Sequence, residues 1–145
     1  MSVPGHFASL RRSTDGSVMV EFALLGPMMI AMLLAVFQFG LGMQNYNALR
    51  GAAADVGREV AVEYQKANLL TNGQIQSLGR ATAIQAPYLL DSDSLVITVQ
   101  NAATQRVSGA RELTLTFTYT VPSVLAVIDL PSFNINYSRP IFVKS

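Results

Sequence analysis

The sequence predicts an α+β fold in which a long N-terminal helix precedes a small antiparallel sheet. Three observations support this prediction. An uncharged stretch from Phe22 to Leu49 is long enough for an apolar helix. Apolar residues then recur at helical spacing as far as Tyr64, and the last third of the chain changes to strict alternation. With 145 residues, the chain has room for one domain.

The first helical segment has the composition of a membrane span. Only 13% of the residues are charged, compared with about 25% in an ordinary soluble domain. From Phe22 to Met43 the only clearly polar side chain is Gln38. At about 1.5 Å per residue this stretch covers roughly 33 Å, the thickness of the hydrocarbon core of a bilayer. We therefore expect residues 17–43 to cross a membrane as a helix.

Other kinds of apolar segment fit the sequence less well. A cleaved secretory signal has a shorter apolar region, and the nearest small-residue cleavage site, Ala52-Ala53-Ala54, lies well beyond this one. A twin-arginine export signal is weaker still, because Arg11-Arg12 is followed by Ser-Thr-Asp-Gly before the apolar run. An uncleaved signal anchor is the main alternative.

The helix is expected to continue beyond the span, over residues 44–69. Its apolar face is formed by residues at three-to-four spacing: Tyr46, Leu49, Ala53, Val56, Val60 and Tyr64. The charged residues lie elsewhere around the helix and are most simply a solvated face. Glu59 and Glu63 come close enough to Arg58 and Lys66 for pairs on the helix surface.

A second, shorter helix is predicted over residues 74–85. Thr71-Asn72-Gly73 is expected to break the long helix, and Pro87 to stop the second one.

Three strands follow, over residues 95–100, 111–121 and 133–143. The middle one is the clearest, since Leu113, Leu115, Phe117, Tyr119 and Val121 alternate with four threonines. Such alternation predicts a half-buried strand with its apolar side chains inward. Packed on the outer part of the long helix, the strands give the α+β arrangement.

The segment between the last two strands, Pro122 to Pro131, is unusually apolar for a loop. It either covers the end of its own core or contacts the membrane or another protein.

Composition argues against an enzyme, a metal protein and a nucleic-acid-binding protein. The net charge is +1, and the chain has no cysteine and a single histidine, His6. Ser-His-Asp and Cys-His chemistry is therefore not expected beyond the N-terminus. Asp91-Ser92-Asp93 is interpreted as a polar turn, because Ala102 occupies the position of the closing glutamate of a calcium loop. No cofactor is predicted.

A short motif at the N-terminal edge of the span resembles the processing site of type IV prepilins. Gly16-Ser17 is followed by Glu21-Phe22, with basic residues upstream and the apolar run downstream. The wider stretch, RRSTDGSVMVEFALLGPMMIAMLLAVFQFG, is similar to the start of the TadE/TadF pseudopilin family of the tight-adherence (Flp) pilus system. Residues 48–59 also resemble that family, so the likeness covers roughly residues 10–60.

The resemblance implies a division of the chain into three parts. A prepilin peptidase would cut between Gly16 and Ser17 on the cytoplasmic face and remove residues 1–16 as a leader. Residues 17–43 would be the transmembrane segment of a bacterial inner-membrane protein, in contact with lipid. Residues 44–145 would form a pilin-like domain on the periplasmic side. Other pilin or pseudopilin subunits and the pilus assembly machinery would be its partners.

Two residues of the motif differ from well-known pilins. Ser17 replaces the methylated phenylalanine of many type IV pilins, which leaves N-methylation open. Phe22 replaces the tyrosine of the short major Flp pilins, which favours the pseudopilin branch.

Glu21 needs a physical reason to lie at the mouth of an apolar span. A charge inside a bilayer costs about 2.5–3.5 kcal/mol on insertion scales. Cleavage after Gly16 would expose the α-amine of Ser17, whose ordinary pKa of about 7.7–8.0 keeps it mostly cationic at neutral pH. That amine could pair with Glu21 of a neighbouring subunit. Alternatively, Glu21 marks the helix end, where an acid interacts favourably with the helix dipole.

Gly26-Pro27 lies in the first turns of the span. Proline removes an intrahelical hydrogen bond, so a kink is expected here, with or without a function in the filament.

Basic residues do not decide the orientation. Arg11 and Arg12 on one side of the span are balanced by Arg50 and Arg58 on the other. The processing motif favours a cytoplasmic N-terminus.

The sequence thus predicts a pseudopilin precursor that takes part in assembly or priming of a tight-adherence pilus used for surface adhesion. The alternatives are an uncleaved single-span anchor carrying a small periplasmic interaction domain, and a secreted binding domain released by ordinary signal peptidase.

Overall fold

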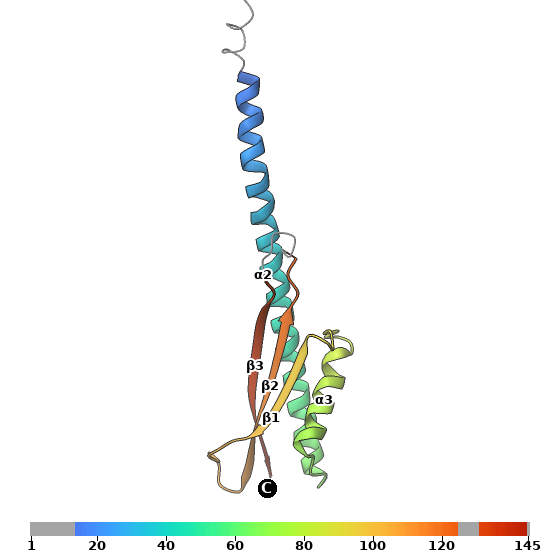
Figure 1. Ribbon diagram of the computed structural model, residues 1–145. Coiled ribbons are helices and arrows are strands. Elements are labelled where there is room, and N and C mark those ends of the chain that lie inside the picture. Colours follow the sequence, from blue (N-terminus) through green and yellow to red (C-terminus); the bar gives the residue numbers. More distant parts are fainter. Residues whose placement is uncertain (1–13, 125–130, 145) are drawn as a thin grey trace, which may run out of the picture. The chain divides into compact units, whose positions relative to one another are not determined.

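The computed structural model describes residues 14–124 and 131–144, and it confirms the α+β fold. Along the chain come a long helix, a short helix and three antiparallel strands (Figure 1). By its internal contacts the chain divides into two units, residues 1–37 and 38–145. The second unit contains the sheet and the core.

Helix α2, Thr14–Gln65, contains both the apolar stretch and its charged continuation. Within the second unit its buried side chains follow the predicted helical spacing. These are Leu49, Ala52, Ala53, Val56, Val60 and Tyr64. Tyr46, which was expected on the same face, is 41% exposed, and its ring meets Tyr137 of the sheet edge to face.

The long helix ends at Gln65, four residues before the predicted end at Leu69. Ala67 takes a left-handed conformation with φ of 63°. The N–H of Ala67 then donates to the carbonyl of Tyr64, and the N–H of Asn68 donates to that of Glu63. This is the hydrogen-bond pattern of a Schellman cap. The predicted end of the helix segment 44–69 was wrong. Such a cap is usually recognised by a glycine in the left-handed position, and here that position is occupied by Ala67.

Helix α3, Asn72–Ile84, begins two residues earlier than the predicted 74–85. Thr71 is its N-cap: its hydroxyl accepts from the N–H of Gln74, and the Gln74 side chain accepts from the N–H of Thr71. Thr71-Asn72-Gly73 therefore starts the second helix and does not break the first. This capping box fixes the start of α3 by satisfying N–H groups that have no partner within the helix.

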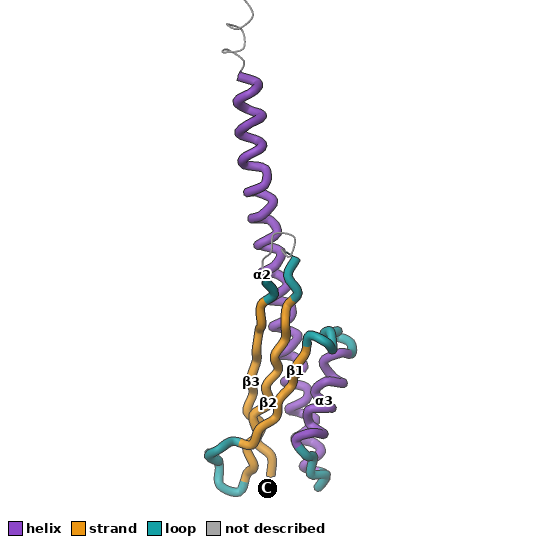
Figure 2. Tube along the Cα trace, viewed as in Figure 1, coloured by secondary structure: helices purple, strands orange, loops and turns teal. Residues whose placement is uncertain are grey.

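The three strands form one antiparallel sheet in the order β1-β2-β3 (Figure 2). Their bounds are Leu95–Asn101 for β1, Ala110–Val121 for β2 and Phe133–Lys144 for β3. Each strand lies within one residue of its predicted range. Leu95 pairs with Tyr119, and Phe117 pairs with Tyr137. Helix α3 packs beside β1.

The apolar face of β2 forms the centre of the core, as its alternation predicts. Its five alternating apolar residues are at most 5% exposed, and Phe117 is the largest fully buried side chain. Gly79 brings α3 close to the sheet, since a Cβ there would lie 3.3 Å from Ile97 and 3.4 Å from Phe117. The threonines on the other face bond across to β3, with Thr116 and Ser138 2.8 Å apart.

Arg111 joins the end of the long helix to the short helix and the sheet. Its guanidinium donates to Tyr64 Oη at 2.7 Å, to Asn72 Oδ1 at 3.0 Å and to Asn101 Oδ1 at 2.9 Å. Tyr64 in turn donates to the carbonyl of Leu70. One side chain thus connects α2, α3, β1 and β2.

Candidate processing and assembly segment

The residues of the predicted processing motif all lie in the first turns of α2. Gly16, Ser17, Glu21 and Phe22 are exposed, Phe22 at 77%. The Ser17 hydroxyl donates to Glu21 Oε1 at 3.3 Å, one turn away. Within the part of the chain that the structure describes, no cation pairs with Glu21. Its carboxylate is therefore available to a group from outside the chain.

Arg11-Arg12, upstream of the motif, and the single histidine, His6, lie outside the described residues. Gly16 and Ser17 lie in the first described turn of α2, and both are exposed.

Gly26 and Pro27 lie inside α2, and the helix runs through them from Thr14 to Gln65. A Cβ on Gly26 would meet only Phe22 Cε1, at 4.0 Å. Pro27 cannot donate a backbone hydrogen bond, so the carbonyl four residues earlier, at Ala23, lacks its helical donor.

The apolar surface around the motif faces outward throughout the first unit. The exposed large hydrophobic side chains from Val18 to Phe37, among them Met19, Leu24 and Leu33, each have at least 56% of their surface open to solvent. Helix α2 is long and apolar enough from Gly16 onward to cross a membrane. Such a surface requires lipid or other apolar helices around it.

Gln38, the lone polar residue of the apolar run, has a structural role that the sequence did not reveal. It is 8% exposed. Its Nε2 donates to the carbonyl of Pro122 at 3.1 Å, and its Oε1 accepts from the N–H of Val124 at 2.8 Å. One amide side chain therefore satisfies two backbone groups where the apolar segment Pro122–Pro131 begins. Residues 125–130 of that segment lie outside the described residues.

Tyr88 holds the segment after α3 against the long helix. Its hydroxyl donates to Asp55 Oδ2 at 2.6 Å, and Arg58 donates to Asp55 Oδ1 at 3.2 Å. The bond to Asp55 raises the pKa of Tyr88. The ring lies directly over Gly51, where a Cβ would come within 2.5 Å of it. Gly51 therefore permits a close approach that any side chain would prevent.

The charged residues of α2 pair only partly as predicted: Glu63 pairs with Lys66, whereas Arg58 and Glu59 do not form the expected pairs. Glu63 accepts from Lys66 Nζ at 2.8 Å and from Asn68 Nδ2 at 2.7 Å, and the bond from Lys66 is the main cause that lowers the pKa of Glu63. Arg58 pairs with Asp55. Glu59 was expected to pair with these cations, but it forms neither a hydrogen bond nor an ion pair with any described side chain.

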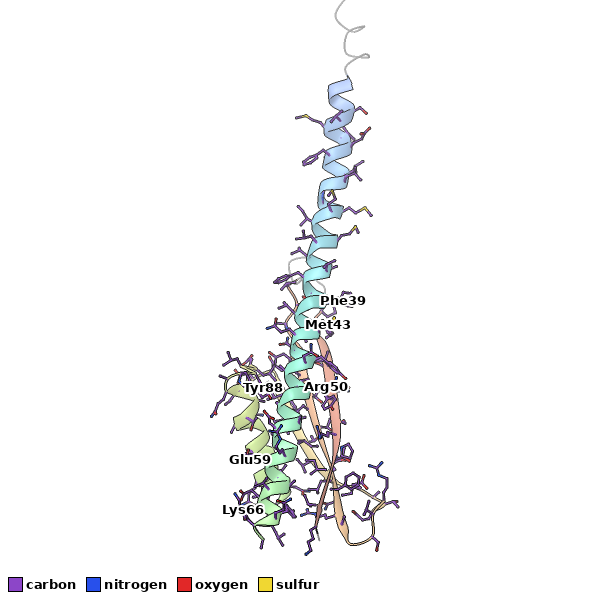
Figure 3. The ribbon with its side chains drawn as sticks, turned by 180° about the vertical axis from the view of Figure 1, so that it is seen from behind. Phe39, Met43, Arg50, Glu59, Lys66 and Tyr88 are labelled. Carbon is purple, nitrogen blue, oxygen red and sulfur yellow. The ribbon has the colours of Figure 1, made fainter. Side chains whose placement is uncertain are left out.

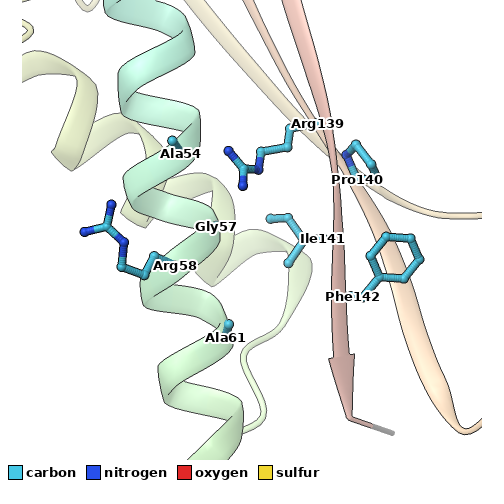
Figure 4. Close-up of a pocket in the computed structure, with 8 residues that line it drawn as sticks. All are labelled: Ala54, Gly57, Arg58, Ala61, Arg139, Pro140, Ile141 and Phe142. Carbon is cyan, nitrogen blue, oxygen red and sulfur yellow. The ribbon is translucent and has the colours of Figure 1, made fainter.

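A groove runs between the second half of α2 and the edge strand β3 (Figure 4). Its volume is about 410 Å³. On the helix side the groove is lined by residues with small side chains, Ala54, Gly57 and Ala61. Arg139 and Ile141 form the opposite wall. A second hollow of about 630 Å³ shares Ala61 and Phe142 with the first and continues toward the C-terminal end of β3.

Residues 16–58 match the family model described as TadE-like protein. The match starts at the glycine of the processing motif and ends within the buried part of α2, so it includes neither α3 nor the sheet. No curated protein and no solved structure matches the chain.

Proposed function

Because the chain is TadE-like over residues 16–58, which indicates a part in the Tad pilus system, we propose that it is a pseudopilin subunit of that system. It takes part in assembly or priming of a tight-adherence (Flp) pilus used for surface adhesion. Its role is structural: it contributes a membrane helix and a pilin-like domain and carries out no reaction.

The observation that carries the proposal is the position of the family match on the helix. The match begins at Gly16, at the residue where the prepilin motif predicts cleavage, and covers the exposed apolar surface that follows. A pseudopilin needs such a surface twice, first against lipid and then against the helices of other subunits.

Processing would occur at the Gly16–Ser17 bond. A prepilin peptidase needs access to this bond, and Gly16 and Ser17 on either side of it are both exposed. Removal of residues 1–16 leaves the α-amine of Ser17 one helical turn from Glu21. The amine of one subunit and the Glu21 carboxylate of its neighbour then form an ion pair that the apolar surroundings strengthen. Phe22 follows Glu21 on the lipid-facing surface.

This role sets the topology. The peptidase acts on the cytoplasmic side, so the N-terminus is cytoplasmic and the domain from residue 44 onward lies in the periplasm. Residues 17–43 cross the inner membrane. Gly26 and Pro27 would allow this helix to bend when it leaves lipid for a filament.

Release by ordinary signal peptidase conflicts with the packing of the domain. The candidate site Ala52-Ala53-Ala54 lies inside α2, and Ala52 and Ala53 are fully buried in the core. Cleavage there would remove Leu49 from the core as well. The uncleaved anchor makes the same contacts as the pseudopilin precursor and differs only in its N-terminus.

The test is the N-terminal sequence and intact mass of the membrane-bound protein, made in cells with and without the prepilin peptidase. The proposal expects a chain that starts at Ser17 only when the peptidase is present. A Gly16 substitution should then leave the leader attached. An intact Met1 start in both cells would overturn processing and support the uncleaved anchor.

A further inference from the structure

Glu59 is the carboxylate of the second unit that lacks a partner within the described residues, and Arg139 is the half-buried cation that lacks one. Arg50 and Lys144 also form no hydrogen bond or ion pair there, but both are exposed. Arg139, on β3, is half-buried in the groove. Within residues 38–124 and 131–144, neither its guanidinium nor the Glu59 carboxylate forms a hydrogen bond or an ion pair. Glu59 acts on Lys66 only as a minor through-space charge. The other described carboxylates of this unit all accept hydrogen bonds.

The position of Arg139 is set by the groove. Its Nε lies 3.6 Å from where a Cβ of Gly57 would be. The side chain therefore reaches from β3 to the surface of α2 at the position where the helix has no side chain. Figure 4 shows the guanidinium of Arg139 directed toward α2. Arg58 also lines the groove, but its guanidinium pairs with Asp55. A half-buried cation has lost part of its hydration, and a carboxylate from outside would compensate for that loss.

Glu59 lies on the opposite side of the helix. Two residues along an α-helix correspond to about 200° around its axis, so Glu59 points away from Gly57 and from the groove. It is exposed, and Val62, one turn later on the same side, is 39% exposed (Figure 3 labels Glu59). The two residues present a carboxylate next to an apolar side chain.

We propose that a second copy of this chain docks the Glu59–Val62 side of its helix α2 into the groove between α2 and β3, where Glu59 pairs with Arg139. The groove offers the complementary pair of features, a cation and the apolar side chains of Ile141 and Phe142. The charges of Glu59 and Arg139, which have no partner within one copy, are then matched by the next copy.

The groove and the Glu59–Val62 side of the helix are different surfaces, so the contact is heterologous. In a pair of copies, one keeps a free groove and the other keeps a free Glu59. Such head-to-tail contacts continue along a filament unless the rotation closes a ring. One exposed ion pair is weak by itself. Copies anchored in the same membrane are held at high local concentration, which lets a weak contact become occupied.

This inference deepens the proposed function, since it rests on the chain acting as an assembly subunit. It does not depend on cleavage after Gly16. Cross-linking between copies can be measured in membranes with and without the peptidase. Absence of the cross-link and absence of cleavage are then two separate results.

Disulfide cross-linking of the full chain tests the contact directly, because the natural sequence has no cysteine. Chains with Glu59→Cys and chains with Arg139→Cys, carrying different tags, are made in the same membrane and oxidised. The proposal expects a mixed dimer and no dimer from either chain alone. A chain with both substitutions should give a ladder of oligomers. Glu59→Cys together with Val96→Cys, on the opposite edge strand β1, is the matched control and should give no dimer.

A charge exchange checks that the two side chains attract each other. Arg139→Glu alone and Glu59→Arg alone should each lower co-purification of differently tagged copies by roughly tenfold, because like charges then face each other. Both substitutions in one chain should restore it. The proposal is overturned if the mixed cysteine pair gives no more dimer than the Val96 control, if either single-cysteine chain forms the dimer alone, or if the double charge exchange fails to restore association.

Discussion

Gln38 illustrates how one residue can violate a sequence pattern for a structural reason. It is the polar exception in an apolar helix, and its amide is used in full on the Pro122–Val124 backbone. The side chain of Gln38 is itself buried, and a buried polar group without a partner costs about 1–3 kcal/mol, so these two bonds avoid that cost for its amide. The helix thus determines where the chain leaves β2 and the apolar segment begins.

We expect Gln38→Met to release that segment. Methionine has a similar length but cannot bond to either backbone group, so the amide of Val124 should lose its protection from hydrogen exchange. Exchange measured by mass spectrometry on peptides covering residues 121–124 is the readout. Gln44→Met is the control, since Gln44 is exposed on the same helix and should leave exchange unchanged. Equal protection in both variants would contradict the role of Gln38.

Two glycines of α2 should respond in opposite ways to alanine. Gly57→Ala adds a Cβ at 3.6–3.8 Å from its neighbours, an ordinary contact, and gains about 0.5–1 kcal/mol of helix propensity. Gly51→Ala places its Cβ 2.5 Å from the ring of Tyr88 and displaces the hydroxyl from Asp55. We expect Gly51→Ala to be about 1–2 kcal/mol less stable than Gly57→Ala.

Urea unfolding of the full chain in detergent, followed by tyrosine fluorescence, measures this difference, since the chain has no tryptophan. Equal stabilities would mean that Tyr88 moves aside at no cost. In that case the bond from Tyr88 to Asp55 adds nothing to stability, and Tyr88→Phe, which removes only this bond, should leave the free energy of unfolding unchanged.

At the level of elements, the alternation of β2 was enough to predict the strand and its buried face. The end of α2 was not predictable in the same way. Its cap places Ala67 in the left-handed region, where a glycine would have been the recognisable signal. The start of α3 did carry a signal, Thr71 followed three residues later by Gln74, which is a capping-box spacing that we interpreted as a break.

The charges of the site were less predictable than the elements. Helical spacing allows Glu59 to approach cations, but which pairs form depends on where β3 and the Tyr88 segment pack. Asp55 takes Arg58, and Glu63 takes Lys66. Arg139 meets α2 only through the tertiary fold, so no local pattern could place it beside Gly57.

Strand β2 carries a buried carboxylate, paired with an arginine of the turn that precedes the strand, whose charge should make stability depend on pH. Glu112 is 4% exposed, and Arg106 Nε donates to its Oε1 at 2.8 Å. This bond is the main cause that lowers the pKa of Glu112. A lowered folded-state pKa stabilises the fold above the ordinary glutamate value of about 4.3, and this stabilisation is lost as the pH falls through the folded value.

Glu112→Gln should therefore flatten the fall of stability between pH 5 and pH 3. Arg106→Met leaves the buried carboxylate without its cation, so at pH 7 it should lower the free energy of unfolding more than Glu112→Gln does. The difference in unfolding free energy between the two variants should narrow at low pH, because Glu112 then takes up a proton. Unfolding free energies from urea titrations at pH 7, 5 and 3 decide this. If the difference in unfolding free energy between the two variants is the same at all three pH values, the Arg106–Glu112 pair does not control the pH dependence.

At the level of the whole molecule, two kinds of stabilisation are separated along one helix. One face of the second half of α2 is buried in the core of its own domain, whereas the large apolar side chains of the first half are mostly exposed within the described residues. Such an exposed apolar surface requires lipid or other apolar helices around it. The domain therefore has a core of its own that does not depend on the first half of the helix.

Glu21 offers the sharpest test of how that helix is used. We expect Glu21→Gln to be cut after Gly16 and to remain in the membrane, because neither step needs the negative charge. It should fail in assembly, because the amine of Ser17 on the adjacent subunit loses its ion pair. Glu21→Asp, which keeps the charge on a shorter side chain, should restore part of the function.

The measurement combines intact mass, which reports cleavage, with counts of surface pili and adherent cells for each variant. Normal piliation by Glu21→Gln would support the other interpretation, in which the acid only interacts with the helix dipole. Loss of cleavage in Glu21→Gln but not in Glu21→Asp would instead assign the charge to recognition by the peptidase. Since the Ser17 hydroxyl already donates to Glu21 within one chain, Ser17→Ala separates that local bond from the pairing between subunits: it removes the hydroxyl and keeps the amine, so it should assemble normally.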